Sequence, residues 1–432
     1  MGGVTEEVER LMKTKIQSVK GMRDFYPEQM ALRNWLYENV RAASRRFGYQ
    51  EYDGPFIETL ELYAARSGDE LVKEQAFVFN DRGGDQITLR PELTPSLARM
   101  VAARQNQLPR PIRWWSFSPM WRYERPQKGR SREFFQWNLD LLGVDSPTAD
   151  AEMVAVIATF FQLIGLTPGE VKIQFNNRRL MDAEIAAAGL ADRKAVVFKL
   201  IDRQDKMSAE AWEKYAAELG INPEELDQLK ALLDNGTLWE KSDECRALVE
   251  AAEALGAGDY LEYDPNVIRG LDYYTGTVIE ARDREGEFRA ILGGGRYDNL
   301  VGDVGGDRIP GVGFAMGDVV MGLVAQKYGK VPPLRPSPSD VLVTVFDQTG
   351  VIEALRLAGE LRAAGLPAEW YPEAVKLDRQ LKYADATGIR LAVIVGPDEA
   401  ARGIVMLKDL QTRSQVAVPR AKIADEIRRK LG

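Results

Sequence analysis

The spacing of hydrophobic residues changes along the chain and divides it into blocks of different predicted structure. Short apolar runs with strand-like alternation are frequent between residues 20 and 176, and they return between residues 256 and 328. From about residue 177 to 255, apolar residues recur at positions i, i+3 and i+4, which is the spacing of amphipathic helices. We therefore predict one antiparallel sheet whose sequence is interrupted by a helical insertion.

A proline-rich segment separates these blocks from the C-terminal part of the chain. Residues 330–340, KVPPLRPSPSD, hold four prolines and are predicted to form a linker. Beyond it, strand-like runs alternate with helical segments, which predicts a small α/β domain with a mostly parallel sheet. The predicted organisation is an α+β domain at 1–176 and 256–330, a helical insertion at 177–255, a linker at 331–339 and an α/β domain at 340–432.

The clearest local prediction is a long antiparallel hairpin at residues 110–143. Two aromatic-rich strands flank the polar loop ERPQKGRSRE, which has a proline and a glycine near its tip. Residues 110–132 carry seven Lys or Arg and one acidic residue, a local charge of +6 in a chain of net charge −8. Arginine binds phosphate oxygens through two donors at once, so the hairpin is a candidate site for a polyanion. A solvated basic hairpin without a ligand is the alternative.

Composition restricts the chemistry. Histidine is absent, so Ser-His-Asp and Cys-His mechanisms are excluded, and any catalysis must use carboxylates, arginines, lysines, tyrosines or backbone groups. A single cysteine, Cys245, excludes intrachain disulfides and suits a reducing cytoplasm. The first residues are acidic and lack a secretory h-region, and no apolar stretch is long enough to cross a bilayer.

The segment before the hairpin places polar residues at the end of a strand. Residues 77–80 and 86–90 are predicted to pair as a hairpin, followed by a helix with Thr94 as its N-cap and Pro95 as its first residue. Glu92 then lies just past a strand end, where a side chain can face a cavity. A carboxylate in such a position is more often a surface group.

Four motifs together resemble the histidyl-tRNA synthetase family of class II aminoacyl-tRNA synthetases. They are RYERPQKGRSREFFQ at 122–136, RGLDYYTG at 269–276, GGGRYDNLVG at 293–302 and KLDRQLKYADATGIRLAVIVG at 376–396. The resemblance covers nearly the whole chain. It implies the class II catalytic fold with an antiparallel sheet, a helical insertion and a C-terminal α/β anticodon-binding domain.

The resemblance also implies an activity. Histidine and ATP would form a histidyl-adenylate, whose acyl group is then transferred to the 3′ end of tRNA-His. ATP and Mg²⁺ are the implied cofactors, and a cytoplasmic homodimer joined near residues 31–59 is the implied assembly. The first step needs positioning and charge neutralisation rather than a protein base, because the attacking group is already a carboxylate.

The resemblance implies roles for residues inside these motifs and, at positions 92, 94 and 140, for residues outside them. Arg122 and Arg269 would hold the α-phosphate, Glu124 and Phe134 the adenine, and Arg130 the terminal phosphates. The histidine-binding residues would be Glu92, Thr94, Gln136, Asp140, Tyr273, Tyr274 and Tyr297, with Asp140 and Tyr274 on the imidazole. Gln127 would touch the acceptor end of the tRNA. An imidazole has one donor and one acceptor edge, which a carboxylate and a phenol together can satisfy.

Two positions depart from the family pattern. The family usually has glutamate at the position of Asp140, so the shorter side chain requires a shifted pocket or a bridging water. The family also commonly has an arginine that contacts the ATP phosphates at the position of Val320, within residues 317–321, GDVVM. Another arginine or Mg²⁺ would have to supply that positive charge.

Two other functions fit parts of the sequence. One is a non-catalytic paralogue that resembles the regulatory subunit of ATP phosphoribosyltransferase and senses histidine. Such paralogues usually lack the tail domain and the RGLDYYTG motif, and both are present here. The other is a nucleic-acid-binding protein without catalysis, which would have no reason to keep Glu92, Gln136, Asp140 and Tyr274 together.

Overall fold

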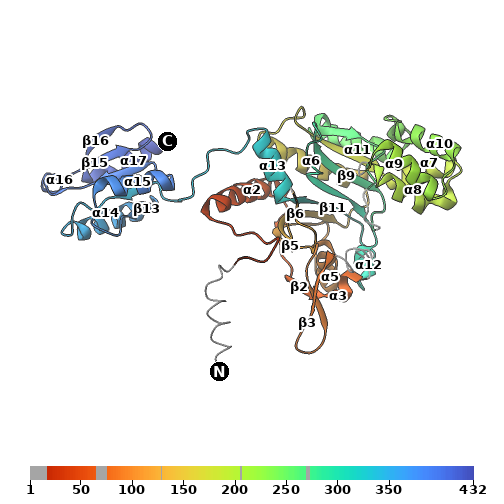
Figure 1. Ribbon diagram of the computed structural model, residues 1–432, viewed down its shortest axis with the longest axis horizontal. Coiled ribbons are helices and arrows are strands. Elements are labelled where there is room, and N and C mark those ends of the chain that lie inside the picture. The colour runs from red at the N-terminus through yellow and green to blue at the C-terminus, as the bar shows by residue number, and fades with distance from the viewer. Residues whose placement is uncertain (1–16, 65–74, 128, 205–206, 269–272) are drawn as a thin grey trace, which may run out of the picture. The chain divides into compact units, whose positions relative to one another are not determined.

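The computed structural model describes residues 17–64, 75–127, 129–204, 207–268 and 273–432. These residues form two compact units, of which the larger extends to Val331 and the smaller begins at Pro332 and includes residues 25–34 (Figure 1). None of the described helices is long and apolar enough to span a membrane.

An eight-stranded sheet is the framework of the larger unit (Figure 1). The strand order is β1 (Gln50–Glu51), β5 (Ile112–Trp121), β6 (Glu133–Leu142), β11 (Gly311–Gly317), β10 (Leu292–Tyr297), β9 (Thr277–Asp283), β7 (Val171–Asn177) and β8 (Leu261–Tyr263). The six central strands pair antiparallel, and only the edge pairs β1–β5 and β7–β8 are parallel. The predicted antiparallel sheet is therefore confirmed for its central part.

The predicted basic hairpin consists of β5 and β6. Its strands pair continuously from Ile112 opposite Leu142 to Trp121 opposite Glu133. Alternation along β6 places Gln136, Asn138 and Asp140 on one face and Trp137, Leu139 and Leu141 on the other. The apolar face packs on a helix, and the polar face is left for a ligand.

Helix α6 (Pro147–Leu163) covers the apolar face of the sheet. Ser146 caps its N-terminus by accepting a hydrogen bond from the Thr148 amide. The ring of Phe160 lies 5.1 Å from that of Trp137, whose other neighbour, Phe314 of β11, is 4.8 Å away. Helix α2 (Pro27–Arg46) contributes Leu36 and Val40 to the same buried core.

Five helices follow β7 and return the chain to β8. They are α7 (Arg178–Ala187), α8 (Lys194–Ile201), α9 (Ala209–Glu218), α10 (Pro223–Leu233) and α11 (Asp243–Ala254). Figure 1 shows α7 to α10 gathered at one end of the larger unit. Their buried apolar residues, such as Leu200 and Leu229, belong to the same hydrophobic cluster as the core beneath the sheet. The helices therefore pack as a continuation of this unit.

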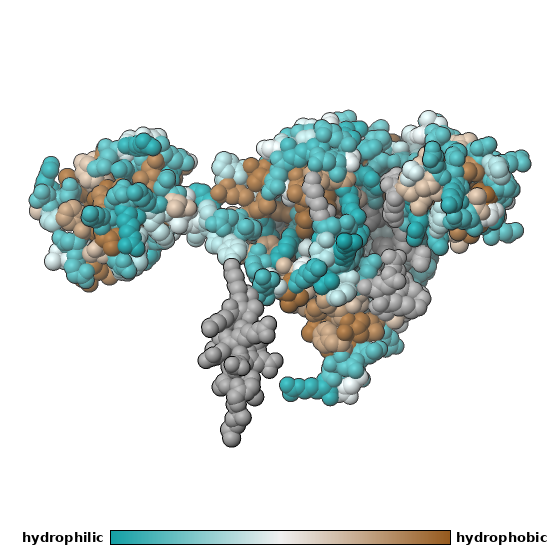
Figure 2. Space-filling model, in the orientation of Figure 1, coloured by the Kyte–Doolittle hydropathy of each residue, from teal (hydrophilic) through white to brown (hydrophobic). Residues whose placement is uncertain are grey.

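A small sheet lies beside the main one. It is formed by β2 (Ile57–Thr59), β4 (Gln86–Leu89) and β3 (Phe77–Asn80), with α3 (Leu60–Ala64) following β2. Figure 2 shows exposed hydrophobic residues in this region. Large apolar side chains with at least 39% exposure here and in the adjoining chain are Phe56, Ile57, Val78, Phe79 and Tyr123.

Helix α5 (Thr94–Arg104) begins one residue earlier than the sequence predicted. Leu93 is the N-cap, with φ −98° and ψ −26°, and no side chain caps this end of the helix. Thr94 and Pro95 therefore occupy the first two helical positions, so the predicted N-cap role of Thr94 is wrong. Helix α12 (Leu300–Asp303) follows β10, and α13 (Asp318–Lys327) follows β11 directly.

The smaller unit has its own sheet, in the order β13 (Ala368–Trp370), β12 (Val341–Val343), β14 (Leu391–Ile394), β15 (Ile404–Asp409), β16 (Gln415–Pro419). Helices α14 (Val351–Ala363), α15 (Leu377–Thr387), α16 (Pro397–Ala401) and α17 (Ile423–Leu431) complete it. Two strand pairs are parallel and two are antiparallel, so the prediction of a mostly parallel sheet is wrong. The turn after Asp409 is short, so β16 can pair with β15 only in the antiparallel direction. The sequence analysis did not predict β16.

We expect Phe160→Ala to lower the free energy of unfolding of the larger unit by about 3–5 kcal/mol, because it opens a cavity between α6 and the sheet. Leu255→Ala is the control, since Leu255 is 51% exposed at the end of α11. It should cost no more than about 1 kcal/mol. Urea unfolding followed by tryptophan fluorescence measures both, and equal losses would contradict this account of the core.

Candidate active site

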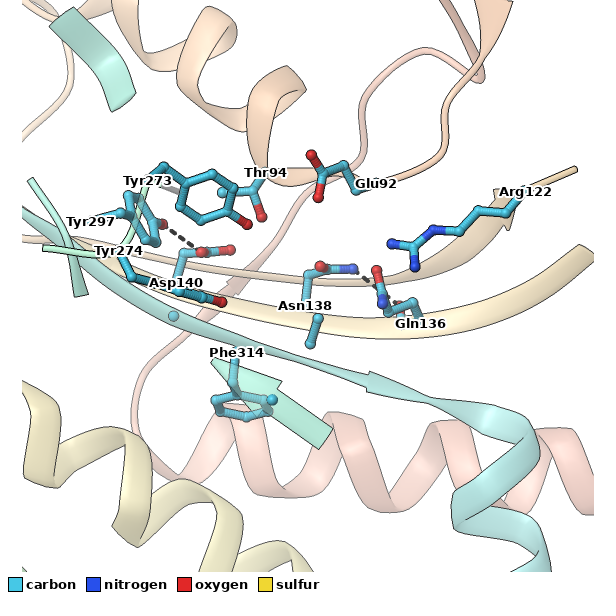
Figure 3. A pocket seen from close by; sticks show the side chains of 13 residues that line it. Glu92, Thr94, Arg122, Gln136, Asn138, Asp140, Tyr273, Tyr274, Tyr297 and Phe314 are labelled. Carbon is cyan, nitrogen blue, oxygen red and sulfur yellow. Dashed lines mark hydrogen bonds between the residues drawn. The ribbon is translucent and has the colours of Figure 1, made fainter. Parts of the chain in front are cut away.

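A cavity of about 110 Å³ lies on the polar face of β6, β11 and β10 (Figure 3). Helix α5 and the residues before it close one side, and the segment just before β9 closes another. The lining residues are Glu92, Thr94, Arg122, Gln136, Asn138, Asp140, Tyr273, Tyr274, Gly293, Tyr297, Gly313, Phe314 and Ala315. The structure thus brings together all seven residues predicted to bind histidine.

Asp140 is at the closed end of this cavity and is only 2% exposed. Its Oδ1 accepts a hydrogen bond of 2.5 Å from the Tyr297 hydroxyl. Its Oδ2 is also buried, and no described residue donates a hydrogen bond to it. Buried acceptors are rarely left unpaired, so Oδ2 is a position that a ligand donor can satisfy.

Burial raises the pKa of the Asp140 carboxyl to about 7, although the hydrogen bond from Tyr297 acts in the opposite direction. Burial also raises the pKa of Tyr297 well above its usual value, and the neighbouring Asp140 charge adds to the effect. Tyr297 therefore keeps its proton and donates a hydrogen bond to Asp140. A carboxyl with a pKa near neutrality exists in both protonation states under ordinary conditions.

Glycine permits the close packing around Asp140. Gly313 lies opposite Asp140 in the β6–β11 pairing. A Cβ at Gly313 would come within 2.1 Å of the Asp140 Oδ1, and one at Gly295 within 2.9 Å of the Tyr274 ring. Larger residues at either position would force the carboxyl or the ring to move.

Three tyrosines form the wall around Asp140. The ring of Tyr273 lies 4.9 Å from that of Tyr274 and 6.1 Å from that of Tyr297, both in edge-to-face contact. These contacts pack the three rings together as one wall of the cavity. In Figure 3, the hydroxyls of the tyrosines and the Asp140 carboxyl converge at one end of the cavity.

The opposite end is lined by charged and amide side chains. Figure 3 shows Glu92 and Thr94 on one side and Gln136 and Asn138 on the other. Glu92 is 6% exposed and lies just before α5, so the reading of it as a surface group is wrong. Arg122 is held by a hydrogen bond of 3.0 Å from its Nε to the Pro91 carbonyl oxygen.

A second cavity, of about 150 Å³, lies on the other side of Arg122. Its lining residues are Arg122, Glu124, Gly129, Arg130, Ser131, Phe134, Gly317, Val319 and Val320. The Arg122 guanidinium is 5.5 Å from the centre of the Phe134 ring, and Arg130 makes an ion pair of 2.7 Å with Glu124. Arg122 lines both cavities, so a group bound at its guanidinium lies between their occupants.

Comparison with known proteins matches both units. A profile for histidyl-tRNA synthetases matches residues 21–318, and a profile for an anticodon-binding domain matches residues 340–430. The histidine–tRNA ligase of Opitutus terrae is 39% identical over 95% of this chain and 98% of its own length. The chain belongs to the histidyl-tRNA synthetase family. Its members are ATP-dependent aminoacyl-tRNA synthetases.

Solved structures agree with this assignment. The histidyl-tRNA synthetase of a Nostoc strain superposes with a TM-score of 0.84 at 26% identity and covers 97% of this chain and 100% of its own. A Bacillus halodurans protein described as an ATP phosphoribosyltransferase regulatory subunit/histidyl-tRNA synthetase shares the fold at 20% identity, with a TM-score of 0.71 over 89% of this chain and 99% of its own.

The family resemblance implies roles for two further residues. Arg269 lies outside the described residues. Gln127 is exposed and lines neither cavity. Its backbone exchanges two hydrogen bonds with that of Arg130, which form the tight turn at the tip of the loop. This turn holds the Gln127 side chain at the outer end of the hairpin.

Sequence reasoning missed two polar residues, one that lines the first cavity and one that fixes the start of α13. Asn138 lies between Gln136 and Asp140 on β6 and lines the first cavity, and the two-residue alternation of that strand was a signal for it. Asp318 begins α13 and accepts hydrogen bonds of 2.9 Å from the Phe135 amide and from Arg23. Burial raises the pKa of Asp318, and the Arg23 charge opposes that shift. Asp318 therefore ties β6 to the start of α13.

We expect Asp140→Asn to change how stability depends on pH. The folded-state pKa of Asp140 is about 7, well above the unfolded value, so the carboxyl stabilises the fold fully at low pH and this contribution is lost as pH rises through 7. The asparagine variant lacks this loss. Its melting temperature relative to the wild type should rise between about pH 4 and 7 and then level off.

Thermal melts of both proteins without ligand, at a series of pH values, measure this difference. Tyr297→Phe is the comparison variant, because it removes the hydrogen bond that lowers the pKa of Asp140 while leaving the carboxyl in place. A difference between wild type and Asp140→Asn that is the same at every pH would contradict a raised pKa.

Proposed function

We propose that this protein binds L-histidine in the first cavity and ATP in the second, forms histidyl-adenylate at Arg122, and transfers the histidyl group to tRNA-His. The observation that carries the proposal is the position of Arg122, which lines both cavities. A carboxylate in the first cavity and an α-phosphate in the second can meet there, and their combined negative charge is opposed by the guanidinium.

Histidine recognition follows from the two ends of the first cavity. An imidazole N–H donates to the unpaired Oδ2 of Asp140, and the ring nitrogen without a proton accepts from the Tyr274 hydroxyl. Tyr273 and Tyr297 enclose the ring. The α-amino group lies among Glu92, Thr94 and Gln136 at the other end. An amino acid without the ring donor leaves a buried carboxyl oxygen unpaired, which disfavours its binding strongly.

ATP recognition uses the second cavity. The adenine stacks on Phe134, and its amino group donates a hydrogen bond to the Glu124 carboxylate. This requires the ion pair between Glu124 and Arg130 to rearrange. Arg130 then binds the terminal phosphates, and Arg269 supplies a second contact to the α-phosphate. ATP enters as its Mg²⁺ complex. The described residues contain no cluster of three side chains suited to hold a metal ion, so the ion would be carried chiefly by the phosphates.

The reaction needs no protein base in its first step. A histidine carboxylate oxygen attacks the α-phosphorus, the bond to the bridging oxygen of the β-phosphate breaks, and pyrophosphate leaves. Arg122 stabilises the charge on the α-phosphate oxygens as the transition state forms. A terminal ribose hydroxyl of the tRNA then attacks the histidyl carbonyl, the carbonyl–phosphate bond breaks, and AMP leaves while the hydroxyl proton passes to a phosphate oxygen or water.

The remaining parts of the chain bind the tRNA. We assign the catalytic domain to 1–176 and 256–330, the insertion to 177–255, the linker to 331–339 and the anticodon-binding domain to 340–432. Gln127 at the hairpin tip contacts the acceptor end, and the insertion holds the acceptor stem. The regulatory paralogue is not favoured, because the profile matches include the anticodon-binding domain at residues 340–430. The protein acts in the cytoplasm.

Exposed apolar side chains support a homodimer. Phe56, Ile57, Val78 and Phe79 are exposed on and beside the three-stranded sheet, and hydrophobic patches of this kind often mark protein interfaces. The short strand β1 is an edge of the main sheet next to α2, within the region predicted to join two copies. Sedimentation of the purified protein as a monomer at micromolar concentration would contradict this assembly.

We expect Arg122→Gln to lower the rate of histidine-dependent exchange between ATP and pyrophosphate about 100- to 1,000-fold, because it removes a cation from the transition state. The folded state should persist, since the side chain is partly exposed at the cavity wall. Exchange is measured without tRNA, so the result reports adenylate formation alone.

Arg125→Gln is the matched control for Arg122→Gln. Arg125 belongs to the same loop, is exposed and lines neither cavity, so this variant removes an equal charge without touching the proposed site. Its exchange rate should stay within about threefold of the wild type, as expected for a surface substitution. Absence of exchange in the wild type, or equal rates in the two variants, would overturn the proposed function.

A further inference from the structure

The second cavity has no basic residue where α13 begins. The residues of this segment that line it are Gly317, Val319 and Val320, which are uncharged. Gly317 provides no side-chain cap, and Asp318 in the first turn is acidic, so this helix end supplies no positively charged side chain. The lining cations among the described residues are Arg122 and Arg130, and both come from the hairpin. Triphosphate binding on the α13 side therefore needs a cation from another segment.

Arg289 is in the segment that reaches this end of the sheet. Leu292, the first residue of β10, pairs with Met316 near the end of β11. Arg289 precedes Leu292 by three residues, and Val319 follows Met316 by three, so both leave the sheet at the same end. The Ile291 amide donates to the Ala281 carbonyl oxygen at 2.7 Å, which fixes the segment just before β10 against β9.

The Arg289 charge is close to two charges of the second cavity. Burial lowers the pKa of the Arg289 guanidinium, the positive charge of Arg130 lowers it further, and the negative charge of Glu124 opposes both effects. Among the described residues, no side chain or backbone group makes a hydrogen bond or ion pair with Arg289. Arg130, by contrast, is already paired with Glu124. The negative charge of Glu124 thus acts on both arginines, although only Arg130 is paired with it.

We propose that Arg289 binds the β- and γ-phosphates of ATP, on the α13 side of the cavity and opposite Arg130. This inference rests on the proposed function, because it assigns a further residue to the same nucleotide site.

The order of groups along the cavity decides which phosphates Arg289 meets. Arg122 adjoins the histidine cavity, so the reacting α-phosphate belongs there, and the other two phosphates extend away from it. Arg130 is the other cation that lines this cavity, and its charge acts on Arg289. Like charges held close together repel each other, and a polyanion placed between them removes that cost while gaining charge-assisted hydrogen bonds. Arg289 is therefore better satisfied with ATP bound than without it.

The test compares Arg289→Gln with Arg104→Gln. Arg104 is an exposed arginine near the end of α5, lines neither cavity, and its substitution removes the same charge. We expect Arg289→Gln to raise the KM for ATP in pyrophosphate exchange about 10- to 100-fold, the size expected for loss of charged hydrogen bonds. Its KM for histidine and its melting temperature should be unchanged, and Arg104→Gln should match the wild type in every value.

Direct binding separates the phosphates. Arg289→Gln should weaken ATP binding by a similar factor and leave AMP binding unchanged, because AMP lacks the β- and γ-phosphates. Arg289→Lys keeps the charge and should recover much of the ATP affinity. Unchanged KM for ATP, equal loss of ATP and AMP binding, or an Arg289→Lys variant as weak as Arg289→Gln would overturn the inference. If the wild type itself showed no exchange, the proposed function would fail instead.

Discussion

The arrangement of the first cavity depends on a carboxyl group buried in the middle of a sheet. Removing Asp140 from water is unfavourable for its charged form, and a single hydrogen bond from Tyr297 offsets only part of that cost. The carboxyl fits in the sheet because Gly313 of β11 lies directly opposite, where any side chain would displace it. The unpaired Oδ2 is costly without a ligand, and that cost is recovered when a suitable donor binds.

The sheet makes this placement rigid. Residues 136, 138 and 140 share the polar face of β6 because side chains alternate along a strand, and the intervening Trp137 and Leu139 are fixed in the core with Phe160. A shift of one residue in the β5–β6 register would bury the amides and expose the tryptophan. Recognition of the ligand and stability of the fold are therefore set by the same strand pairing.

Much of the fold could be predicted from the sequence, because local spacing decides most elements. The hairpin, the helical run after β7 and the alternating tail are all signalled by apolar periodicity. The sheet of the smaller unit was predicted to be mostly parallel because strand direction depends on the turns between strands, which composition does not reveal. The strand β16, which pairs antiparallel with β15, was missed altogether. Thr94 was misplaced by one position because capping preference is a weak signal where Leu93 already adopts helical angles.

The candidate site was predictable only in part. The family resemblance implied the seven residues that the structure gathers in one cavity, and four of them, Gln136, Tyr273, Tyr274 and Tyr297, lie in its motifs. Spacing alone gave no distances between them. The position of Asn138 could have been predicted from the alternation of side chains along β6. Asp318 could not, because the groups that it binds, Arg23 and the Phe135 amide, are far from it in sequence. Arg289 likewise carries no local signal, because the charges that act on it belong to Arg130 and Glu124 of the hairpin loop, which are far from it in sequence.

Arg122 belongs to the walls of two adjoining cavities, and this has a consequence for the order of events. Under the proposed function, the substrate that arrives first would orient the guanidinium and so alter the affinity for the second. Thermodynamic reciprocity requires the influence to be the same in both directions. One side chain can thus make the amino acid and the nucleotide bind cooperatively, without any movement of the sheet that holds them.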